Sequence, residues 1–563
     1  MRRLIATTLV VVLTGCGTVE TPTAPVPARD YYGTLEPFAA EAVYFIVTDR
    51  FVDGDESNNF PGQGGTRLRT FDRPIQLADS PPANIGYLGG DFQGILDNGG
   101  YIADMGFTAI WTTPIVDNPD EAFTGGLRPG EGIFTDRGKT GYHGYWGVNF
   151  FQVDEHLESP ALTFADLARS LRDDYDIKYV LDVVCNHGSP AYTMPEDQPK
   201  FGELYDADGK LVADHENLHP TELDPHNPLH AFYNTRPDLA ELSDFDEDNP
   251  DVLEYFVSAY SQWLDQGVAA FRIDTIKHMP DSYWKAFSDR IREKRPGLFM
   301  FAESYSYDAA EIARHTWSEN GSISVLDFPG RQAMDDVFAK GEPYSSIESY
   351  LHLESGIYEN PYDLMTFYDN HDMPRMDADN EGFIDAHNWL FTSRGIPVVY
   401  YGSEIAFRAG TDQHAGNRDY FGQNNVNKAK SHPIRDALSR IAAVRGQSIA
   451  LQRGLQANLA FDDHTATFFR VYQKDGVAQS ALVLLNKRDK PTRFYVQKWL
   501  GEGTWKDAIT GDVVEITEDD PALVEIVAAH GVRVYFNDQV VSDTELIAEL
   551  DRLQANARRR NRE

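Results

Sequence analysis

KYVLDVVCNH, residues 178–187, is a short run of apolar, β-prone residues that ends in polar side chains. Seven other runs repeat this pattern, namely VYFIVTDR (43–50), TAIWTTP (108–114), VAAFRIDT (268–275), LFMFAES (298–304), ISVLDFP (323–329), LMTFYDNHD (364–372) and PVVYYGSE (397–404). Continuous apolar runs of this length are typical of parallel strands whose outer faces are covered by helices. The chain therefore contains eight candidate strands of one parallel sheet.

Helix-like segments lie between many of these runs, for example at 163–173 and 282–294. Eight strand and helix units predict an α/β fold of the (β/α)8 TIM-barrel type, in which the polar strand ends gather on one face. The spacing agrees, because Asp274 and Glu303 are 29 residues apart, about one repeat, and Glu303 and Asp372 are 69 apart, about two. The 92 residues from Asp182 to Asp274 exceed one unit and predict a subdomain inserted after the third strand.

These signals predict the domain boundaries. The barrel occupies 35–187 and 249–445, and the inserted subdomain occupies 188–248. From residue 446 to 538, short alternating runs separated by turn residues predict a C-terminal antiparallel β-sandwich. Residues 539–563 predict a short amphipathic helix, expected to pack on that domain, and a basic tail.

The composition excludes several classes of protein. The 563 residues include 50 Lys and Arg against 88 Asp and Glu, a formal net charge of −38, so we expect no nucleic-acid partner. Two cysteines cannot form a disulfide framework. Cys185, in an apolar strand, is predicted to be a buried core thiol. We expect a monomer.

The first residues have the pattern of an export signal. Arg2 and Arg3 precede the apolar run 4–13, which is too short to span a bilayer, and Thr14-Gly15-Cys16 follows. This ending resembles the bacterial lipobox, which implies a signal peptide at 1–15 and a lipid on Cys16 that anchors the protein to a membrane. An ordinary cleaved signal is the alternative. Residues 16–34 are Pro- and Thr-rich and predict an extended linker, and Gly17 favours the outer membrane of an exporting bacterium.

Three acids stand at predicted strand ends: Asp274, Glu303 and Asp372. Glycoside hydrolysis needs one ionised and one protonated carboxyl group on either side of the bond that is cut. Arg272 lies two residues before Asp274, on the same side of the strand, and would keep that carboxylate ionised. Glu303 follows an apolar run, a setting that favours the protonated form. Any one of these acids could be structural, but three at barrel spacing indicate a catalytic site.

Four motifs in order resemble the α-amylase family of retaining α-glucan hydrolases and transglycosidases: DVVCNH (182–187), FRIDTIKH (271–278), FAES (301–304) and FYDNHD (367–372). The resemblance implies that Asp274 is the nucleophile, Glu303 the general acid/base, and Asp372 the acid that binds the sugar hydroxyls. It also implies an α-glucan substrate and substrate-binding roles for further residues, namely Tyr145, Trp146, His143, His187, Arg272, Lys277, His278, His371 and Asp182.

The resemblance also implies calcium. Calcium takes six to eight oxygen ligands, and the loop at 53–59 is rich in them, although it lacks EF-hand spacing and could be a solvated turn. Cyclodextrin glucanotransferases of this family bind calcium here, which implies as ligands Asp53, Asp55, Asn58, Asn59, Gly89 and Asp91. A second site between domains would use Asn186, Glu241 and the His278 carbonyl, with Glu241 in place of the usual aspartate.

Several segments resemble the cyclodextrin glucanotransferases in particular, among them YLGGDFQGI (87–95). Those enzymes place an aromatic residue where this chain has Pro237, and they carry further domains beyond the β-sandwich. We therefore expect an endo-acting α-amylase that hydrolyses α-1,4 bonds. The alternatives are a transglycosidase, a cyclomaltodextrinase and a non-catalytic glucan-binding lipoprotein, the last disfavoured because all three acids are present.

Overall fold

The computed structural model describes residues 29–76, 83–128, 137–408 and 417–557. Its central sheet has eight parallel strands in the spatial order β14-β13-β12-β7-β4-β1-β16-β15. These strands are β1 (Val43–Ile46), β4 (Ala109–Thr112), β7 (Lys178–Val183), β12 (Val268–Ile273), β13 (Phe299–Ala302), β14 (Ser324–Val325), β15 (Met365–Thr366) and β16 (Ile396–Tyr400). A parallel bridge between Leu326 and Met365 joins the two ends of the sheet. The predicted (β/α)8 barrel is confirmed.

A helix follows each strand and covers the outside of the barrel. In chain order these helices are α3 (Gly99–Asp104), α4 (Phe164–Tyr175), α5 (Pro250–Asp265), α6 (Asp281–Lys294), α7 (Ala309–Ala313), α8 (Phe328–Phe338), α9 (Asn380–Thr392) and α11 (Pro433–Gly446). Helix α4 shows why they form where they do. Thr163 and Asp166 make a capping box at its start, Asp176 ends it in a left-handed conformation, and the helix buries Leu167 and Leu171 against the sheet.

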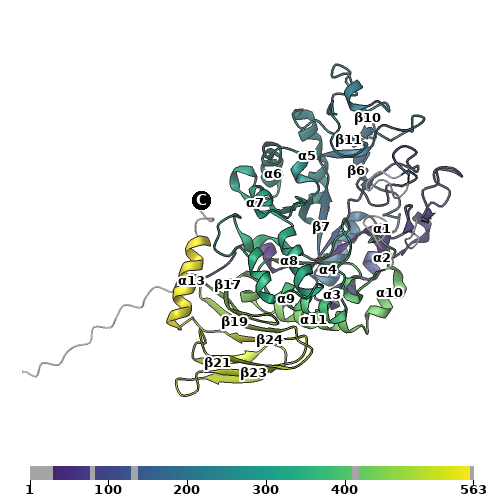
Figure 1. The fold of residues 1–563 in the computed structure, drawn as a ribbon. Coiled ribbons are helices and arrows are strands. Elements are labelled where there is room, and N and C mark those ends of the chain that lie inside the picture. Colours follow the sequence, from purple (N-terminus) through teal and green to yellow (C-terminus); the bar gives the residue numbers. More distant parts are fainter. Residues whose placement is uncertain (1–28, 77–82, 129–136, 409–416, 558–563) are drawn as a thin grey trace, which may run out of the picture.

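Several connections on the catalytic side of the barrel are long, and two of them contain strands that pair with one another. Between β4 and α4 the chain forms the antiparallel pair β5 (Val116–Asp117) and β6 (Asn149–Val153). Between β7 and α5 it forms β8 (His187–Pro190), β9 (Glu203–Tyr205), β10 (Leu211–Asp214) and β11 (Leu242–Asp244), where β8 pairs with β11 and β9 with β10. Figure 1 shows β10 and β11 at the end of the molecule farthest from the C-terminal strands. The insertion after the third strand is confirmed, whereas the long connection after the second strand was not predicted.

The C-terminal region is an antiparallel β-sandwich, as predicted. Six strands form one sheet in the order β17-β18-β19-β24-β21-β22. Their bounds are β17 (Leu455–Phe461), β18 (Thr465–Lys474), β19 (Val477–Asn486), β21 (Gly503–Asp507), β22 (Val513–Ile516) and β24 (Gly531–Asn537). The pair β20 (Thr492–Val496) and β23 (Leu523–Val527) packs its buried side chains on the same core.

Helix α13 (Thr544–Ala557) closes one edge of this core with Leu546, Leu550 and Leu553 (Figure 1). The first described residues lie beside α13. Tyr31 pairs with Gln473 of β18, and its hydroxyl donates to Asp551 of α13 at 2.9 Å. The predicted signal peptide, Cys16 and the basic tail lie outside the described residues. Within the described ranges, no helix is both long and apolar enough to cross a membrane.

One ion pair couples the barrel to the sandwich and predicts a pH effect on stability. His530 places Nδ1 2.7 Å from Asp385 Oδ2 on α9 and Nε2 3.0 Å from Asp489 Oδ1. The hydrogen bond to Asp385 raises the pKa of His530 from 6.5 to about 9. Because the folded pKa lies above the unfolded one, the stabilisation is complete below pH 6.5 and is lost as the pH rises through about 9.

We therefore expect the melting temperature of the wild type to fall more steeply between pH 6.5 and 9.5 than that of His530→Gln. Burial raises the pKa of Asp385 to about 6, so this partner is largely ionised in that window. Differential scanning calorimetry of both proteins across the window measures the effect. Parallel curves would contradict the assignment.

Candidate active site

A cavity of about 360 Å³ opens where the barrel strands end. Its lining comprises Lys139, His143, Tyr145, Trp146, His187, Leu239, Leu242, Asp274, Thr275, Lys277, His278, Glu303, Tyr305, His371, Asp372 and Arg418. All three acids selected from the sequence are in this set, with seven of the nine residues assigned to substrate binding. The remaining two, Arg272 and Asp182, lie beneath the cavity.

Arg272 is the central cation beneath the floor of the cavity. Its position in β12 pairs with Asp182 in β7, and the two side chains meet with Nη1 2.8 Å from Oδ1. Nη1 also donates to Asp274 Oδ1 at 2.8 Å, one residue beyond the end of the strand. The guanidinium is fully buried, so its charge is little screened. It therefore fixes the Asp274 carboxylate and offsets its negative charge.

Glu303 approaches the same guanidinium from the neighbouring strand. It follows the last residue of β13, and Oε2 lies 2.7 Å from Arg272 Nη2. Oε1 is buried and has no hydrogen-bond partner within the described ranges. Burial raises the pKa of Glu303 well above 4.5, with the charges of Asp372 and Asp274 acting in the same direction against Arg272. Glu303 is therefore suited to hold a proton and present it to the cavity.

Asp372 lies at the end of the segment that follows β15. Arg418 Nη2 donates to its Oδ1 at 2.5 Å, and His371 Nε2 is 3.4 Å from its Oδ2. Burial lowers the pKa of His371 well below 6.5, and Arg418 acts in the same direction, so this imidazole is neutral. A neutral histidine, an arginine and a carboxylate on one wall offer both donors and acceptors to a polar ligand.

Aromatic side chains form the wall contributed by the segment before β6. The Tyr145 ring stacks on His371 at 5.3 Å, and its hydroxyl donates to Asp182 at 2.9 Å. The Trp146 ring meets His143 edge-on at 5.0 Å. Across the cavity, His187 Nε2 lies 4.0 Å from Asp274 Oδ2, and burial lowers the pKa of His187. Flat apolar rings beside hydrogen-bonding groups suit a sugar, which has apolar faces and hydroxyl rims.

The assignment of Asp182 to substrate binding needs correction. Its side chain is fully buried, and it accepts hydrogen bonds from Arg272, from Tyr145 and from Trp111 Nε1, the last at 3.0 Å. The reason is depth, because Asp182 is still inside β7 whereas Asp274 and Glu303 follow the last residues of their strands. Asp182 and Arg272 therefore position cavity residues rather than line the cavity.

Six lining residues were not selected from the sequence: Lys139, Leu239, Leu242, Thr275, Tyr305 and Arg418. Thr275 and Tyr305 could have been found, because each follows a selected acid within two residues. Arg418 comes from the long connection after β16 and Lys139 from the one after β4, where no periodic pattern marks them. Lys277 donates to the Tyr305 carbonyl at 2.9 Å, so these two residues form one end of the cavity.

The predicted calcium loop brings side-chain oxygens together. Asp53 Oδ1, Asn58 Oδ1 and Asn59 Oδ1 are all buried and have no hydrogen-bond partner in the described part of the chain. Gly89, at φ 89°, passes so close that a Cβ there would lie 2.3 Å from Asn59 Oδ1. Unsatisfied buried oxygens are costly unless a ligand meets them, and an oxygen-only set suits calcium.

The other two predicted ligands of this loop have different contacts. Asp91 caps α2 (Phe92–Asp97), where Oδ1 accepts from Gly94 N at 2.7 Å and Oδ2 accepts from Asp55 N at 2.7 Å. The Asp55 carboxylate accepts from Ser57 N at 3.0 Å. In the structure these two carboxylates shape the loop.

The second predicted calcium group assembles around a different acid. Asp238 Oδ2 lies 2.8 Å from His278 Nδ1 and 3.5 Å from Asn186 Nδ2. The carbonyl of Glu241, the predicted ligand, accepts from Ala191 N at 2.8 Å. Ala240, at φ 48°, turns the chain between the two acids. Asp238 is therefore the carboxylate beside Asn186 and His278, and it was not predicted from the sequence.

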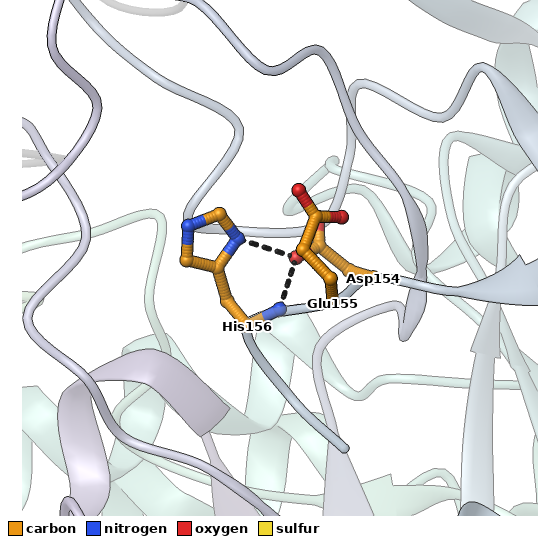
Figure 2. Close-up of side chains that lie close together, drawn as sticks. All are labelled: Asp154, Glu155 and His156. Carbon is orange, nitrogen blue, oxygen red and sulfur yellow. Dashed lines mark hydrogen bonds and ion pairs between the residues drawn. The ribbon is translucent and has the colours of Figure 1, made fainter. Parts of the chain in front are cut away.

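A further group of acids lies outside the cavity. Asp154 Oδ1 accepts from the His156 backbone at 3.0 Å and lies 2.8 Å from its Nδ1, with Glu155 beside them (Figure 2). Asp154 Oδ2 accepts from Tyr87 at 3.0 Å, and the Tyr87 ring stacks on His156 at 3.7 Å. These contacts tie the segment after β6 to the segment before α2, so the group has a structural role.

Comparison with known proteins agrees with this geometry. The family profile described as alpha amylase, catalytic domain, matches residues 45–444. A cyclomaltodextrin glucanotransferase of Thermoanaerobacterium thermosulfurigenes is 29% identical over 517 residues, which cover 87% of this chain and 66% of that protein. An α-amylase of Niallia circulans is 32% identical over 380 residues, which cover 65% of this chain and 67% of that protein. This chain thus spans just under two thirds of the length of that transferase.

A solved structure matches most of this chain. CldA, a cyclomaltodextrin glucanotransferase with a three-domain ABC distribution, superposes with a TM-score of 0.70 at 28% identity, covering 89% of this chain and 99% of its own. The matched profile takes in most of this chain, and every residue that lines the cavity lies within it. The chain belongs to the α-amylase family of glycosidases.

Proposed function

We propose that this protein is a retaining α-glucan hydrolase that cuts α-1,4 bonds within starch, glycogen or maltooligosaccharides. The observation that carries the proposal is the contact of Asp274 and Glu303 with the two terminal nitrogens of one buried guanidinium. One guanidinium can reach both carboxyl groups only if they are close together. Retaining enzymes hold this pair about 5–5.5 Å apart, whereas inverting enzymes hold it about 6.5–9.5 Å apart to admit a water.

The chemistry follows from the two environments. Asp274 attacks the anomeric carbon and forms a glycosyl ester while Glu303 gives its proton to the leaving oxygen. Glu303, now ionised, then takes a proton from water, which hydrolyses the ester with net retention. Asp372 and His371 form hydrogen bonds with the hydroxyls of the reacting sugar, and the Tyr145 ring stacks on its apolar face.

Hydrolysis and glycosyl transfer share these residues and differ in whether water or a sugar receives the glycosyl group. Pro237 supports hydrolysis, because it is exposed and absent from the cavity lining, where aliphatic Leu239 and Leu242 stand instead. The number of domains no longer supports it, since CldA is a transferase with three domains. Because similar proteins include cyclomaltodextrin glucanotransferases, glycosyl transfer is the second candidate function.

Product analysis separates the two candidates. The purified protein is incubated with soluble starch, and its products are resolved by chromatography beside those of Glu303→Gln. We expect linear maltose and short maltooligosaccharides, absent from the variant. Cyclic or lengthened products would make the transferase the correct assignment.

We also propose that the loop at 53–59 binds one calcium ion through Asp53, Asn58, Asn59 and the Gly89 carbonyl, with Asp55 and Asp91 shaping the loop. The buried unpartnered oxygens of the first three support this set. Bound calcium would coordinate these oxygens, offset the negative charge of Asp53 and hold the loop against α2. The second site, predicted at Asn186, Glu241 and the His278 carbonyl, stays a prediction.

Removing calcium is expected to lower the melting temperature by about 2–3 °C at a hundredfold excess of calcium over its dissociation constant, because binding then contributes about 2.7 kcal/mol to folding. Thermal unfolding with calcium and with a chelator measures the shift. Asn59→Ala should lose it, and Glu56→Gln, an exposed neighbour, should keep it. An equal shift in Asn59→Ala and the wild type would exclude this loop as the site.

We propose that the chain is exported and lipidated on Cys16, which the sequence pattern supports. Detergent phase separation of full-length protein made in a bacterium tests this. The wild type should enter the detergent phase and Cys16→Ser the aqueous phase. If both proteins stay aqueous, the anchor is excluded.

A further inference from the structure

Lys139 is a lysine that is almost fully buried, with 3% of its surface exposed, and yet lines the active-site cavity. Its backbone is held from two sides. Its carbonyl accepts from Phe123 N at 2.9 Å, and the next residue donates from Thr140 N to Ile85 O at 3.1 Å. These hydrogen bonds fix the backbone at Lys139, and a side chain on a fixed backbone is suited to a defined role in binding.

The barrel topology places Lys139 at one end of the cavity. Tyr142, three residues after Lys139, lies under the Arg50 guanidinium at 3.6 Å, and Arg50 follows β1. Lys277 and Tyr305 follow β12 and β13, which stand opposite β16 and β1 in the eight-strand order. Asp274 and Glu303 lie between the two ends. Because Glu303 faces the leaving group beside Tyr305, the opposite end holds the part of the glucan that stays on the enzyme.

The end of the cavity that contains Lys139 is rich in cations, which is unusual for a chain of net charge −38. Tyr142 is fully buried, which by itself raises the pKa of a tyrosine, but Arg50, Lys139 and Arg418 together lower its pKa below 10.0. The neighbouring Tyr145 shows the ordinary effect, since burial raises its pKa well above 10.0. Arg50 and Arg418 also form ion pairs with carboxylates. Arg50 Nη1 lies 2.7 Å from Asp49 Oδ2, and Arg418 contacts Asp372.

We propose that Lys139 is a specificity-determining residue whose ammonium group donates hydrogen bonds to hydroxyls of the glucosyl unit next to the reacting sugar, on its non-reducing side. The inference rests on the proposed function. An ammonium group has three donors and no acceptor, and sugar hydroxyl oxygens accept. When the glucan displaces water from the cavity, such charge-assisted bonds gain strength because the surroundings become less polar.

Two glycosyl fluorides isolate this contact. α-Glucosyl fluoride fills only the reacting-sugar position, whereas α-maltosyl fluoride adds the neighbouring unit, and the leaving group is the same. In Lys139→Met we expect kcat/KM for the maltosyl compound to fall roughly 10- to 100-fold, as for a lost hydrogen bond to a charged group. The value for the glucosyl compound should change by less than about threefold. Lys200→Met is the matched control, because Lys200 pairs with Asp117 and Asp120 outside the cavity.

Equal losses on both fluorides would show a merely structural role for Lys139 and overturn the proposal, as would unchanged rates on both. If Lys139→Met does not fold, Lys139→Gln replaces it, with folding checked by thermal unfolding.

If the wild type cleaves neither fluoride, the proposed function fails, and Lys139 is tested by binding alone. Maltotetraose is then titrated calorimetrically into Glu303→Gln and into the double variant that also carries Lys139→Met. The double variant should have a roughly tenfold larger dissociation constant, and an unchanged constant would overturn the proposal.

Discussion

Asp274→Asn is expected to lower kcat on maltoheptaose by roughly 10⁴-fold or more, because the amide cannot form the glycosyl ester. The contact with Arg272 Nη1 at 2.8 Å gives a second reason. That guanidinium also holds Asp182 and Glu303, so the loss of one carboxylate leaves its charge less well balanced. Removal of the nucleophile should therefore disable both steps of the reaction.

Reducing-sugar release at saturating maltoheptaose measures the loss, and thermal unfolding confirms that the variant is folded. Asp265→Asn, at an exposed position at the end of α5, is the matched control and should keep full activity. If Asp274→Asn kept more than about a tenth of the wild-type rate, Asp274 would not be the nucleophile.

Glu303→Gln is expected to lower kcat/KM on maltoheptaose roughly 10²- to 10⁴-fold, the usual contribution of general acid catalysis. The loss should be much smaller for formation of the glycosyl ester from α-maltosyl fluoride, because fluoride leaves without a proton. Measuring the first turnover by fluoride release separates this step from the second. Equal losses on both substrates would contradict the role of proton donor.

The same residue sets a pH dependence. Burial raises the pKa of Glu303 well above 4.5, so the carboxyl group keeps its proton at pH values where an ordinary glutamate is already ionised. Wild-type activity on maltoheptaose should fall as the pH rises through that pKa, because the donor loses its proton. In Glu303→Gln the residual activity on α-maltosyl fluoride should lack this decline. A variant with the wild-type profile would assign the basic limb to another group.

Much of the fold could be predicted because two independent signals coincide. The apolar runs mark the barrel strands, and the acids at their ends mark the side on which the strands stop. Asp274 and Glu303 were found because each directly follows its strand, β12 or β13. The short strands β14 and β15, of two residues each, were found through their flanking apolar residues.

The parts that could not be predicted depend on long connections. Arg418 reaches Asp372 from the connection after β16, and Lys139 reaches the cavity from the connection after β4. No periodicity links these residues to the acids, because only the closed barrel brings their loops together. Asp182 was misplaced for a different reason, since a motif does not reveal that its residue lies two positions deeper in the barrel than Asp274 and is therefore covered.

The most direct test of the central claim is to identify the residue that carries the glycosyl ester. Glu303→Gln is incubated with α-maltosyl fluoride, digested at acid pH and analysed by peptide mass spectrometry. Because the variant forms the ester but lacks the base that activates water, the ester should accumulate. We predict a mass increase of one maltosyl unit on the peptide that contains Asp274. An adduct on another residue, or fluoride release without any adduct, would contradict the proposed retaining mechanism.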